Sequence, residues 1–362
     1  MAGSEALFRE TSQKEMTQKE MPQKEMPQKE MPHPEAVILD IQRMSTEDGP
    51  GLRTTVFFKG CNLSCPWCHN PESIDKKPVV TWFPRRCIGC GICRKACPQK
   101  GISSGEEGIR FNRSLCLACG TCAEECPGGA IEIKGRNIPV DKLAAELLKD
   151  FFYFGKDGGV TLSGGEVMVQ HEAALELTRL LKAAGINIAI DTAGCYDFSL
   201  LEAMLPYIDL VLYDLKIFDS EAHKRLLGAG NSLILENYRR LMDMKVRVWV
   251  RTPIIPGATD SEENIAAIGN FIAKAGRAGD DIPAGRGENS PGTPAVNLPE
   301  RWELCAFNKL CRDKYDALDR DWAYKDAGLT EKTHIEKLTM IAARYFPGAV
   351  YTGAVAETGG EP

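Results

Sequence analysis

Three cysteines within eight residues constrain this chain more than any other feature. Cys61, Cys65 and Cys68 are spaced C-x3-C-x2-C and are framed by Gly60 and Pro66. The short gaps force a tight loop in which the three thiols point at one soft centre, and thiolates favour iron–sulfur clusters, zinc or Cu(I). A cubane [4Fe–4S] cluster normally takes four cysteines, so three ligands would leave one iron open to a substrate. The alternative is a zinc site with His69 as the fourth ligand.

Two further groups of cysteines repeat one pattern, C-x2-C-x2-C-x3-C-P, 29 residues apart. This pattern is the bacterial ferredoxin run, in which the fourth cysteine ligates the cluster of the other run. A pair of zinc sites would not need the proline that follows the fourth cysteine in both copies. We therefore expect two closed [4Fe–4S] clusters that carry electrons, three clusters in all. The predicted ligands are Cys87, Cys90, Cys93 and Cys126 for one closed cluster, and Cys97, Cys116, Cys119 and Cys122 for the other.

Composition narrows the class of protein. The chain has 362 residues, 43% hydrophobic and 26% charged, with a net charge of −6. This balance gives no reason to expect nucleic acid or an anionic membrane as a partner, and no apolar stretch is long enough for a membrane span. Eleven of the 14 cysteines fall in the three groups, and residues 1–35 lack the apolar core of a secretory signal. Metal ligation in a reducing, anaerobic cytoplasm fits these cysteines better than a disulfide framework.

Two segments are predicted to be flexible. Residues 1–35 repeat the pentapeptide Gln-Lys-Glu-Met-Pro, which is too polar to bury a core and reads as a disordered tail. Its methionines are alternative thioether ligands, but a flexible repeat is a poor site for a metal. Residues 276–300 are rich in Gly, Pro and charge and are predicted to be a loop insertion, with contact to a partner as the alternative. The methionines in question are Met16, Met21, Met26 and Met31.

Strands and helices alternate along the rest of the chain, which favours a parallel sheet. The predicted strands are Arg53–Phe58, Gly159–Ser163, Ile186–Asp191, Asp209–Asp214, Val246–Thr252 (ended by Pro253) and Leu304–Phe307. The predicted helices are Val140–Phe152, Leu175–Ala184, Leu233–Met244, Glu262–Ala275 and Lys332–Tyr345, followed by a short, loose tail. Polar motifs stand at the carboxyl ends of these strands, where functional groups collect in β/α barrels.

The three-cysteine loop, with Trp67 before its last cysteine, resembles the radical S-adenosylmethionine (radical SAM) superfamily. The runs Asp48–Arg53, Phe57–Cys61 and Asn70–Ser73 resemble one branch of it, the activating enzymes of glycyl-radical enzymes. The resemblance implies an α/β fold, a partial barrel of about six strands over residues 36–80 and 136–355. It also implies a ferredoxin-like α+β module with two [4Fe–4S] clusters, inserted at residues 81–135.

The resemblance also implies a reaction. S-adenosylmethionine on the open cluster would be cleaved reductively to a 5′-deoxyadenosyl radical, which takes hydrogen from a glycine of a partner glycyl-radical enzyme. In the Ser163–Glu166 motif Gly165 would contact the amino group of the methionine moiety. In the motif Asp214-Leu215-Lys216, Asp214 would pair with the ammonium group of the methionine moiety and Lys216 with its carboxylate group. The remaining contacts that it implies are Trp67, Cys68, His69, Gly164, Glu166, Asp191, Thr192 and Asn308, the last where related enzymes often have a histidine.

Partners and rival functions follow from the same motifs. An electron donor such as flavodoxin or ferredoxin is expected. Asn308–Tyr315 and Tyr351–Gly353 are similar to activators from sulfonate- or hydrocarbon-degrading anaerobes, which favours isethionate sulfite-lyase as the partner, then an alkyl- or benzylsuccinate synthase. The rivals are a radical SAM enzyme acting on a small molecule or another peptide, and a plain ferredoxin-type electron carrier. The isolated cysteines are read as buried small hydrophobes; they are Cys195, Cys305 and Cys311.

Overall fold

The computed structural model describes residues 33–105, 108–275 and 297–357. The predicted repeat tail therefore lies outside the described residues up to residue 32, and the predicted loop insertion does so over residues 276–296. No helix in the described part of the chain is long and apolar enough to cross a membrane.

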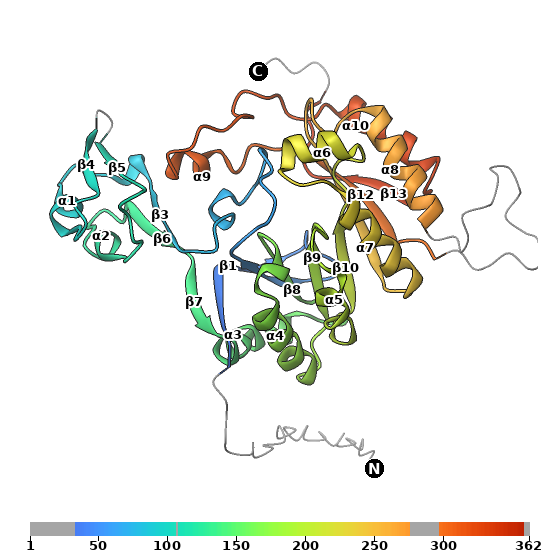
Figure 1. Ribbon diagram of the computed structural model, residues 1–362, viewed down its shortest axis with the longest axis horizontal. Coiled ribbons are helices and arrows are strands. Elements are labelled where there is room, and N and C mark those ends of the chain that lie inside the picture. Colours follow the sequence, from blue (N-terminus) through green and yellow to red (C-terminus); the bar gives the residue numbers. More distant parts are fainter. Residues whose placement is uncertain (1–32, 106–107, 276–296, 358–362) are drawn as a thin grey trace, which may run out of the picture. The chain divides into compact units, whose positions relative to one another are not determined.

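A single nine-stranded sheet runs through the described chain (Figure 1). Its strands are β1 (Glu35–Ser45), β2 (Arg53–Phe58), β7 (Arg136–Pro139), β8 (Gly159–Gly164), β9 (Ile188–Thr192), β10 (Leu210–Asp214), β11 (Val248–Ile254), β12 (Arg301–Ala306) and β13 (Ala349–Thr352). The strand order is β13-β12-β11-β10-β9-β8-β2-β1-β7. The seven strands from β13 to β2 are parallel, and β1 and β7 add an antiparallel margin. The sheet is therefore mixed and open, with β13 and β7 at its edges.

Helices pack against the sheet, whose central strands bury side chains on both faces. Val160 and Leu162 of β8 share one core with Leu177 of α4 and are completely buried. The α-helices outside the cysteine-rich region are α3 (Val140–Leu147), α4 (His171–Ala183), α5 (Phe198–Glu202), α6 (Ser220–Leu227), α7 (Ser232–Asp243), α8 (Glu262–Ala275), α9 (Arg312–Ala317) and α10 (Lys332–Ala343). Short 3-10 turns are η1 (Pro71–Ser73), η3 (Leu148–Tyr153), η4 (Val167–Gln170) and η5 (Leu205–Tyr207).

All six predicted parallel strands are present, but two expectations at the carboxyl end were wrong. The segment after Tyr345 is not a loose tail, because β13 pairs with β12 from Ala349 to Thr352. The sheet thus has a seventh parallel strand. The fifth predicted strand does not end at Pro253, since β11 continues to Ile254. The Arg251 carbonyl accepts from the Leu215 N–H, just past the end of β10. Pro253, two residues further on, faces the same side, where β10 has already ended. The N–H that proline lacks therefore costs no hydrogen bond of the sheet.

Residues 79–134, here called the cysteine-rich segment, fold between β2 and β7. Their elements are β3 (Val79–Trp82), η2 (Pro84–Arg86), α1 (Ile92–Ala96), β4 (Ile102–Gly105), β5 (Gly108–Phe111), α2 (Thr121–Glu124) and β6 (Ile131–Lys134). The first and last strands pair antiparallel, and β4 and β5 form a hairpin. Val80, Trp82, Ile102, Ile109 and Ile131 make a small core of their own.

Arg53 ties the beginning of the parallel sheet together. Its side chain is completely buried at the start of β2. The guanidinium donates to Thr161 Oγ1 at 2.6 Å and to the Val160 carbonyl at 2.8 Å, both on β8, and to Asn187 Oδ1 at 3.1 Å ahead of β9. One cation on β2 therefore satisfies acceptors on β8 and ahead of β9, which explains an arginine at the start of a buried strand.

Replacing this arginine tests that account. Arg53→Leu should lower the free energy of unfolding by about 3–5 kcal/mol, because it removes the buried donor that these acceptors share. The measurement is the unfolding midpoint under anaerobic conditions. The control is Arg136→Leu, whose side chain is 56% exposed and meets Glu146 at 3.4 Å, and which should shift stability by no more than about 0.5 kcal/mol. Equal, small effects of the two variants would contradict the role given to Arg53.

Candidate active site

A cavity of about 590 Å³ lies at the carboxyl ends of the parallel strands. Its wall is formed by the loop after β2 and by residues at or just past the ends of β8, β9, β10, β11, β12 and β13. Parallel α/β sheets present functional side chains at this edge. The topology therefore brings together polar residues that are far apart in the sequence.

The three-cysteine loop (residues 61–69) forms one wall of this cavity, with Cys61, Cys65 and Cys68 all lining it. Backbone hydrogen bonds fix the start and the middle of the loop. Cys61 N–H donates to the Ile74 carbonyl at 3.0 Å, and Ser64 N–H donates to the Leu227 carbonyl at the end of α6, also at 3.0 Å. Burial raises the pKa of Cys61 to about 11 and that of Cys68 to about 12, so these thiols need a cationic centre to become thiolates.

Helix α9 holds the other side of the loop. The Tyr315 hydroxyl donates to the Cys68 carbonyl at 3.0 Å. Lys314 Nζ donates to the His69 carbonyl at 3.0 Å and to Asn70 Oδ1 at 2.6 Å. The sequence prediction placed no helix here, because six residues are too few to show a helical period.

Gly164 and Gly165 are required by close packing of the backbone. Gly164 has φ +126°, and a Cβ on it would lie 2.2 Å from the Phe58 carbonyl oxygen. A Cβ on Gly165 would lie 2.2 Å from the Gly60 carbonyl oxygen. The end of β8 thus packs directly against the chain that enters the three-cysteine loop, and both glycines also line the cavity. The predicted close approach therefore includes one to the protein's own backbone.

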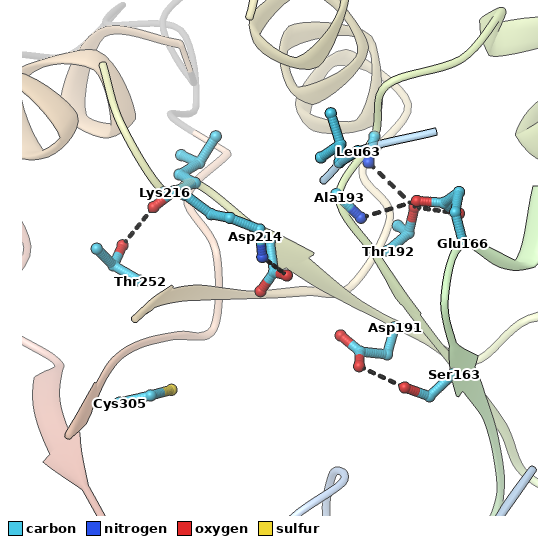
Figure 2. Close-up of polar contacts among 12 residues, drawn as sticks. Leu63, Ser163, Glu166, Asp191, Thr192, Ala193, Asp214, Lys216, Thr252 and Cys305 are labelled. Carbon is cyan, nitrogen blue, oxygen red and sulfur yellow. Dashed lines mark hydrogen bonds and ion pairs between the residues drawn. The ribbon is translucent and has the colours of Figure 1, made fainter. Parts of the chain in front are cut away.

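Glu166 is bound within the protein and is not among the residues that line the cavity. It is 1% exposed. Thr192 Oγ1 donates to its carboxylate at 2.9 Å and Ala193 N–H at 3.0 Å, both at the end of β9 (Figure 2). Burial raises its pKa to about 7. We now interpret Glu166, predicted to contact the cofactor, as a positioning residue that joins the ends of β8 and β9.

Asp191, Asp214 and Lys216 do line the cavity, on neighbouring strand ends (Figure 2). Asp191 Oδ2 accepts from Ser163 at 2.7 Å, whereas its buried Oδ1 has no hydrogen-bond partner within the described chain. Burial and the nearby Asp214 raise the pKa of Asp191 to about 6. Lys216 forms an ion pair with Asp214; burial alone would lower its pKa, but the surrounding anions, Asp214 first, hold that pKa above its usual value.

Sequence reasoning missed an ion pair on the two strands that follow β10 in the sheet. Arg251 on β11 meets Glu303 on β12 at 3.0 Å, with only 12% and 7% of their side chains exposed. The signal was a lone arginine and a lone glutamate within apolar strands, but the pattern alone does not say which face they occupy. Cys305, predicted to be a buried hydrophobe, is only partly buried and lines the cavity.

The other predicted residues divide between the cavity and the core. Trp67, His69 and Asn308 line the cavity, and the Trp67 ring packs edge-on against Tyr324 at a centroid distance of 6.1 Å. Leu215 is buried; its carbonyl accepts from Thr252 Oγ1 at 2.8 Å, and the residue does not line the cavity. Asn308 Oδ1 accepts from the Leu310 N–H at 3.1 Å.

The two predicted cysteine quartets line two separate cavities within the cysteine-rich segment. Cys87, Cys90, Cys93 and Cys126 border one, beside Trp82 and Ile131. The second, beside Val80 and Phe111, is bordered by Cys97, Cys116, Cys119 and Cys122. In each case the fourth cysteine of one run lies with the first three of the other. Across residues 33–105, 108–275 and 297–357, no three His, Cys, Asp or Glu side chains converge on a position for a single metal ion.

Comparison with known proteins shows the family. Residues 55–267 match the Radical SAM superfamily. The benzylsuccinate synthase activating enzyme of Thauera aromatica is 36% identical over 314 residues, 84% of this chain and 88% of that protein. The isethionate sulfite-lyase activating enzyme of Desulfovibrio desulfuricans is 36% identical over 295 residues, 79% and 88% of the two chains. The indoleacetate decarboxylase activating enzyme of Tractidigestivibacter scatoligenes is 39% identical over 251 residues, 66% and 80% of the two chains.

These matches span most of the chain and agree with the site that the strands assemble. The chain therefore belongs to the radical SAM superfamily and, within it, to the activating enzymes of glycyl-radical enzymes. The family implies a [4Fe–4S] cluster and S-adenosylmethionine, and the residues present fit both. Three thiols line one cavity, and a buried carboxylate oxygen of Asp191 has no hydrogen-bond donor in the described chain. Among the described residues, the charged side chains that line the cavity are five acids and two bases, Lys216 and Arg251. Such a cavity suits a ligand of net charge +1.

The different roles assigned to Glu166 and Asp191 can be tested in the absence of a cofactor. Glu166→Ala should lower the free energy of unfolding by about 1–3 kcal/mol, because the Ala193 N–H loses its acceptor and the buried Thr192 hydroxyl keeps only the Tyr196 hydroxyl. Asp191→Asn keeps an acceptor for Ser163 and should cost about 0.5 kcal/mol or less. The measurement is the unfolding midpoint of both variants without S-adenosylmethionine. A larger loss in Asp191→Asn would show that the two carboxylates have been assigned the wrong way round.

Proposed function

We propose that this chain cleaves S-adenosylmethionine reductively and uses the product radical to take hydrogen from a glycine of a partner glycyl-radical enzyme. The single observation that supports this most is the shared cavity, which joins the three-cysteine loop to Asp191, Asp214 and Lys216. These residues are the cluster ligands and the charged groups that the reaction needs. The reducing electron, the sulfonium and the target glycine all have to meet there.

The cysteines and the charged side chains of the cavity have different roles in the proposed reaction. Cys61, Cys65 and Cys68 hold the open cluster, which when bound supplies one electron to split the sulfonium into methionine and a 5′-deoxyadenosyl radical. Asp214 would accept from the amino group of the methionine moiety, and Lys216 would donate to its carboxylate. These two residues already form an ion pair, so the ligand would replace an existing charge contact and avoid burying an unpaired charge.

The nucleoside end of the ligand is assigned to β9 and the three-cysteine loop. Asp191 Oδ1, buried and without a partner in the described chain, would accept from a ribose hydroxyl. Trp67, whose indole lines the cavity, would pack near the adenine. Gly164 and Gly165 keep the β8 backbone close to the loop and leave room for the ligand.

We assign two closed [4Fe–4S] clusters to the cysteine-rich segment, which brings the total to three. Two observations support this: each predicted quartet lines a cavity of its own, and each quartet draws one cysteine from the other run. The paired outer strands and the central hairpin suit a ferredoxin-like module. An external one-electron donor such as flavodoxin or ferredoxin would supply the module.

Isethionate sulfite-lyase is our first candidate for the partner, followed by an alkyl- or benzylsuccinate synthase. Activating enzymes for isethionate sulfite-lyase and benzylsuccinate synthase are both 36% identical to this chain, so overall identity does not separate the two. Action on a small molecule or another peptide is the rival within the superfamily. A plain electron carrier would have no use for the cavity at the strand ends.

The loss of one loop cysteine tests the open cluster. After anaerobic reconstitution, Cys65→Ala should release no 5′-deoxyadenosine from S-adenosylmethionine under reducing conditions, because the cluster loses one of only three ligands. The product is measured by chromatography. The control is Cys311→Ala, a buried cysteine that does not line the cavity, and it should retain the activity. Release at the normal rate by Cys65→Ala would overturn the site assignment.

The partner is tested with purified glycyl-radical enzymes. Isethionate sulfite-lyase and benzylsuccinate synthase are each mixed with the reduced protein and S-adenosylmethionine, and the glycyl radical is read by electron paramagnetic resonance. We expect a radical signal in isethionate sulfite-lyase, and none when its radical glycine is replaced by alanine. A signal only in the succinate synthase would select the second candidate. 5′-Deoxyadenosine without a radical in any glycyl-radical enzyme tested would favour the small-molecule rival.

A further inference from the structure

Residues 312–320, here called the α9 bracket, contact the three-cysteine loop on one side. Besides Tyr315, which donates to the Cys68 carbonyl at 3.0 Å, Arg320 donates to the Pro71 carbonyl at 3.3 Å. Lys314 adds an ion pair with Glu72 at 3.3 Å. The bracket therefore holds the chain on which the third cysteine of the open cluster lies.

The other side of the α9 bracket faces the cysteine-rich segment and is hydrogen-bonded to Arg113 of that segment. Arg113 Nη2 donates to Asp319 Oδ2 at 2.8 Å and to the Ala317 carbonyl at 3.5 Å. Among the described residues between Phe83 and Ala130, Arg113 alone forms a hydrogen bond or an ion pair with a residue outside the segment. Figure 1 shows α9 beside β3, consistent with contacts between these two elements.

Arg113 belongs to the side of the segment that holds the second quartet. Its carbonyl accepts from the Cys116 N–H at 3.4 Å, and its guanidinium also donates to the Val80 carbonyl. Val80 lines the cavity of Cys97, Cys116, Cys119 and Cys122, whereas the first quartet shares its cavity with Trp82 and Ile131. Among the hydrogen bonds and ion pairs of the described residues, those that join the segment to the bracket therefore lie on the side of the second quartet.

We propose that electrons leave the cysteine-rich segment through the cluster held by Cys97, Cys116, Cys119 and Cys122, and reach the open cluster across the α9 bracket. The proposal rests on the proposed function, which supplies the three clusters. The cluster of the second quartet is oxidised by one electron and the open cluster is reduced by one; no bond forms or breaks. The one-electron donor protein named above restores the electron, which enters through the first quartet's cluster.

The physical reason is the path between the centres. Electron tunnelling weakens steeply with distance and is stronger through bonds and hydrogen bonds than through gaps. A connected path starts at the Cys116 N–H, which donates to the Arg113 carbonyl, and continues from the Arg113 guanidinium to Asp319. It then follows the α9 bracket back to Tyr315, whose hydroxyl donates to the Cys68 carbonyl. Arg113 and Tyr315 act here as positioning residues that fix the separation of two clusters.

Two matched cysteine variants test the order of the clusters. Cys90→Ala and Cys119→Ala each remove the second cysteine of a run, and both side chains are exposed. In fully reduced protein, paramagnetic resonance reports the magnetic coupling of the open cluster to its nearest neighbour. Cys119→Ala should abolish this coupling and Cys90→Ala should leave it in place. Coupling that survives in Cys119→Ala and disappears in Cys90→Ala would overturn the proposal.

A second pair of variants keeps all eleven ligands. Arg113→Gln removes the ion pair with Asp319, and Arg110→Gln is the control because Arg110 is an exposed arginine on β5 of the same segment. With a protein electron donor, Arg113→Gln should slow the reduction of the open cluster several-fold and weaken the magnetic coupling, and Arg110→Gln should change neither. Equal rates and equal coupling in the two variants would overturn the proposal.

The failure of the three-cluster assignment, on which the proposed function relies for its electrons, would look different. Wild-type protein would then hold about four irons per chain, with no coupled centres, in place of the roughly twelve of three cubane clusters. Wild-type protein with about twelve irons and a coupling lost only in Cys90→Ala would keep the function and reject the path.

Discussion

The site depends on how the backbone around the three-cysteine loop is held. Gly164 and Gly165 bring the end of β8 against the carbonyl oxygens of Phe58 and Gly60, and hydrogen bonds from Gly165 and Glu166 N–H to those carbonyls, at 2.9 and 2.8 Å, fix the contact. From the other side, α6 and α9 hold the loop at its carbonyl and amide groups. A loop pinned at this many points can present three thiols in one arrangement without relying on the metal to impose it.

Charge gives this cavity its selectivity. Its acids outnumber its bases, and its two cations are each engaged by an acid, Lys216 by Asp214 and Arg251 by Glu303. An anionic ligand would have to break one of these pairs, whereas a zwitterionic sulfonium of net positive charge can insert between Lys216 and Asp214 and keep both satisfied. The cavity thus combines thiols for a reductant with acids for a cation, the two requirements of reductive sulfonium cleavage.

The sequence predicted most of the parallel sheet because its strands are buried on both faces and read as apolar runs between glycines and prolines. It missed β13, a four-residue strand with only Ala349 buried, and it misjudged Pro253 because a sequence does not show where the neighbouring strand ends. The cysteine groups could be recognised because the spacing of the cysteines along the chain already indicates which of them can reach one centre. Glu166 was assigned to the ligand because a motif cannot tell whether a carboxylate faces the cavity or, as here, Thr192 and Ala193. Arg251, α9 and Arg113 depend on long-range contacts that no local pattern encodes.

The central claim is that an iron with only three cysteine ligands takes the amino and carboxylate groups of S-adenosylmethionine. The most direct test is electron–nuclear double resonance on the reduced, anaerobic protein mixed with S-adenosylmethionine labelled with 15N in its amino group and 17O in its carboxylate. We predict hyperfine coupling of both labels to the reduced cluster, lost in Cys65→Ala. Reduced clusters that show no coupling to either label in the presence of saturating S-adenosylmethionine would contradict the account.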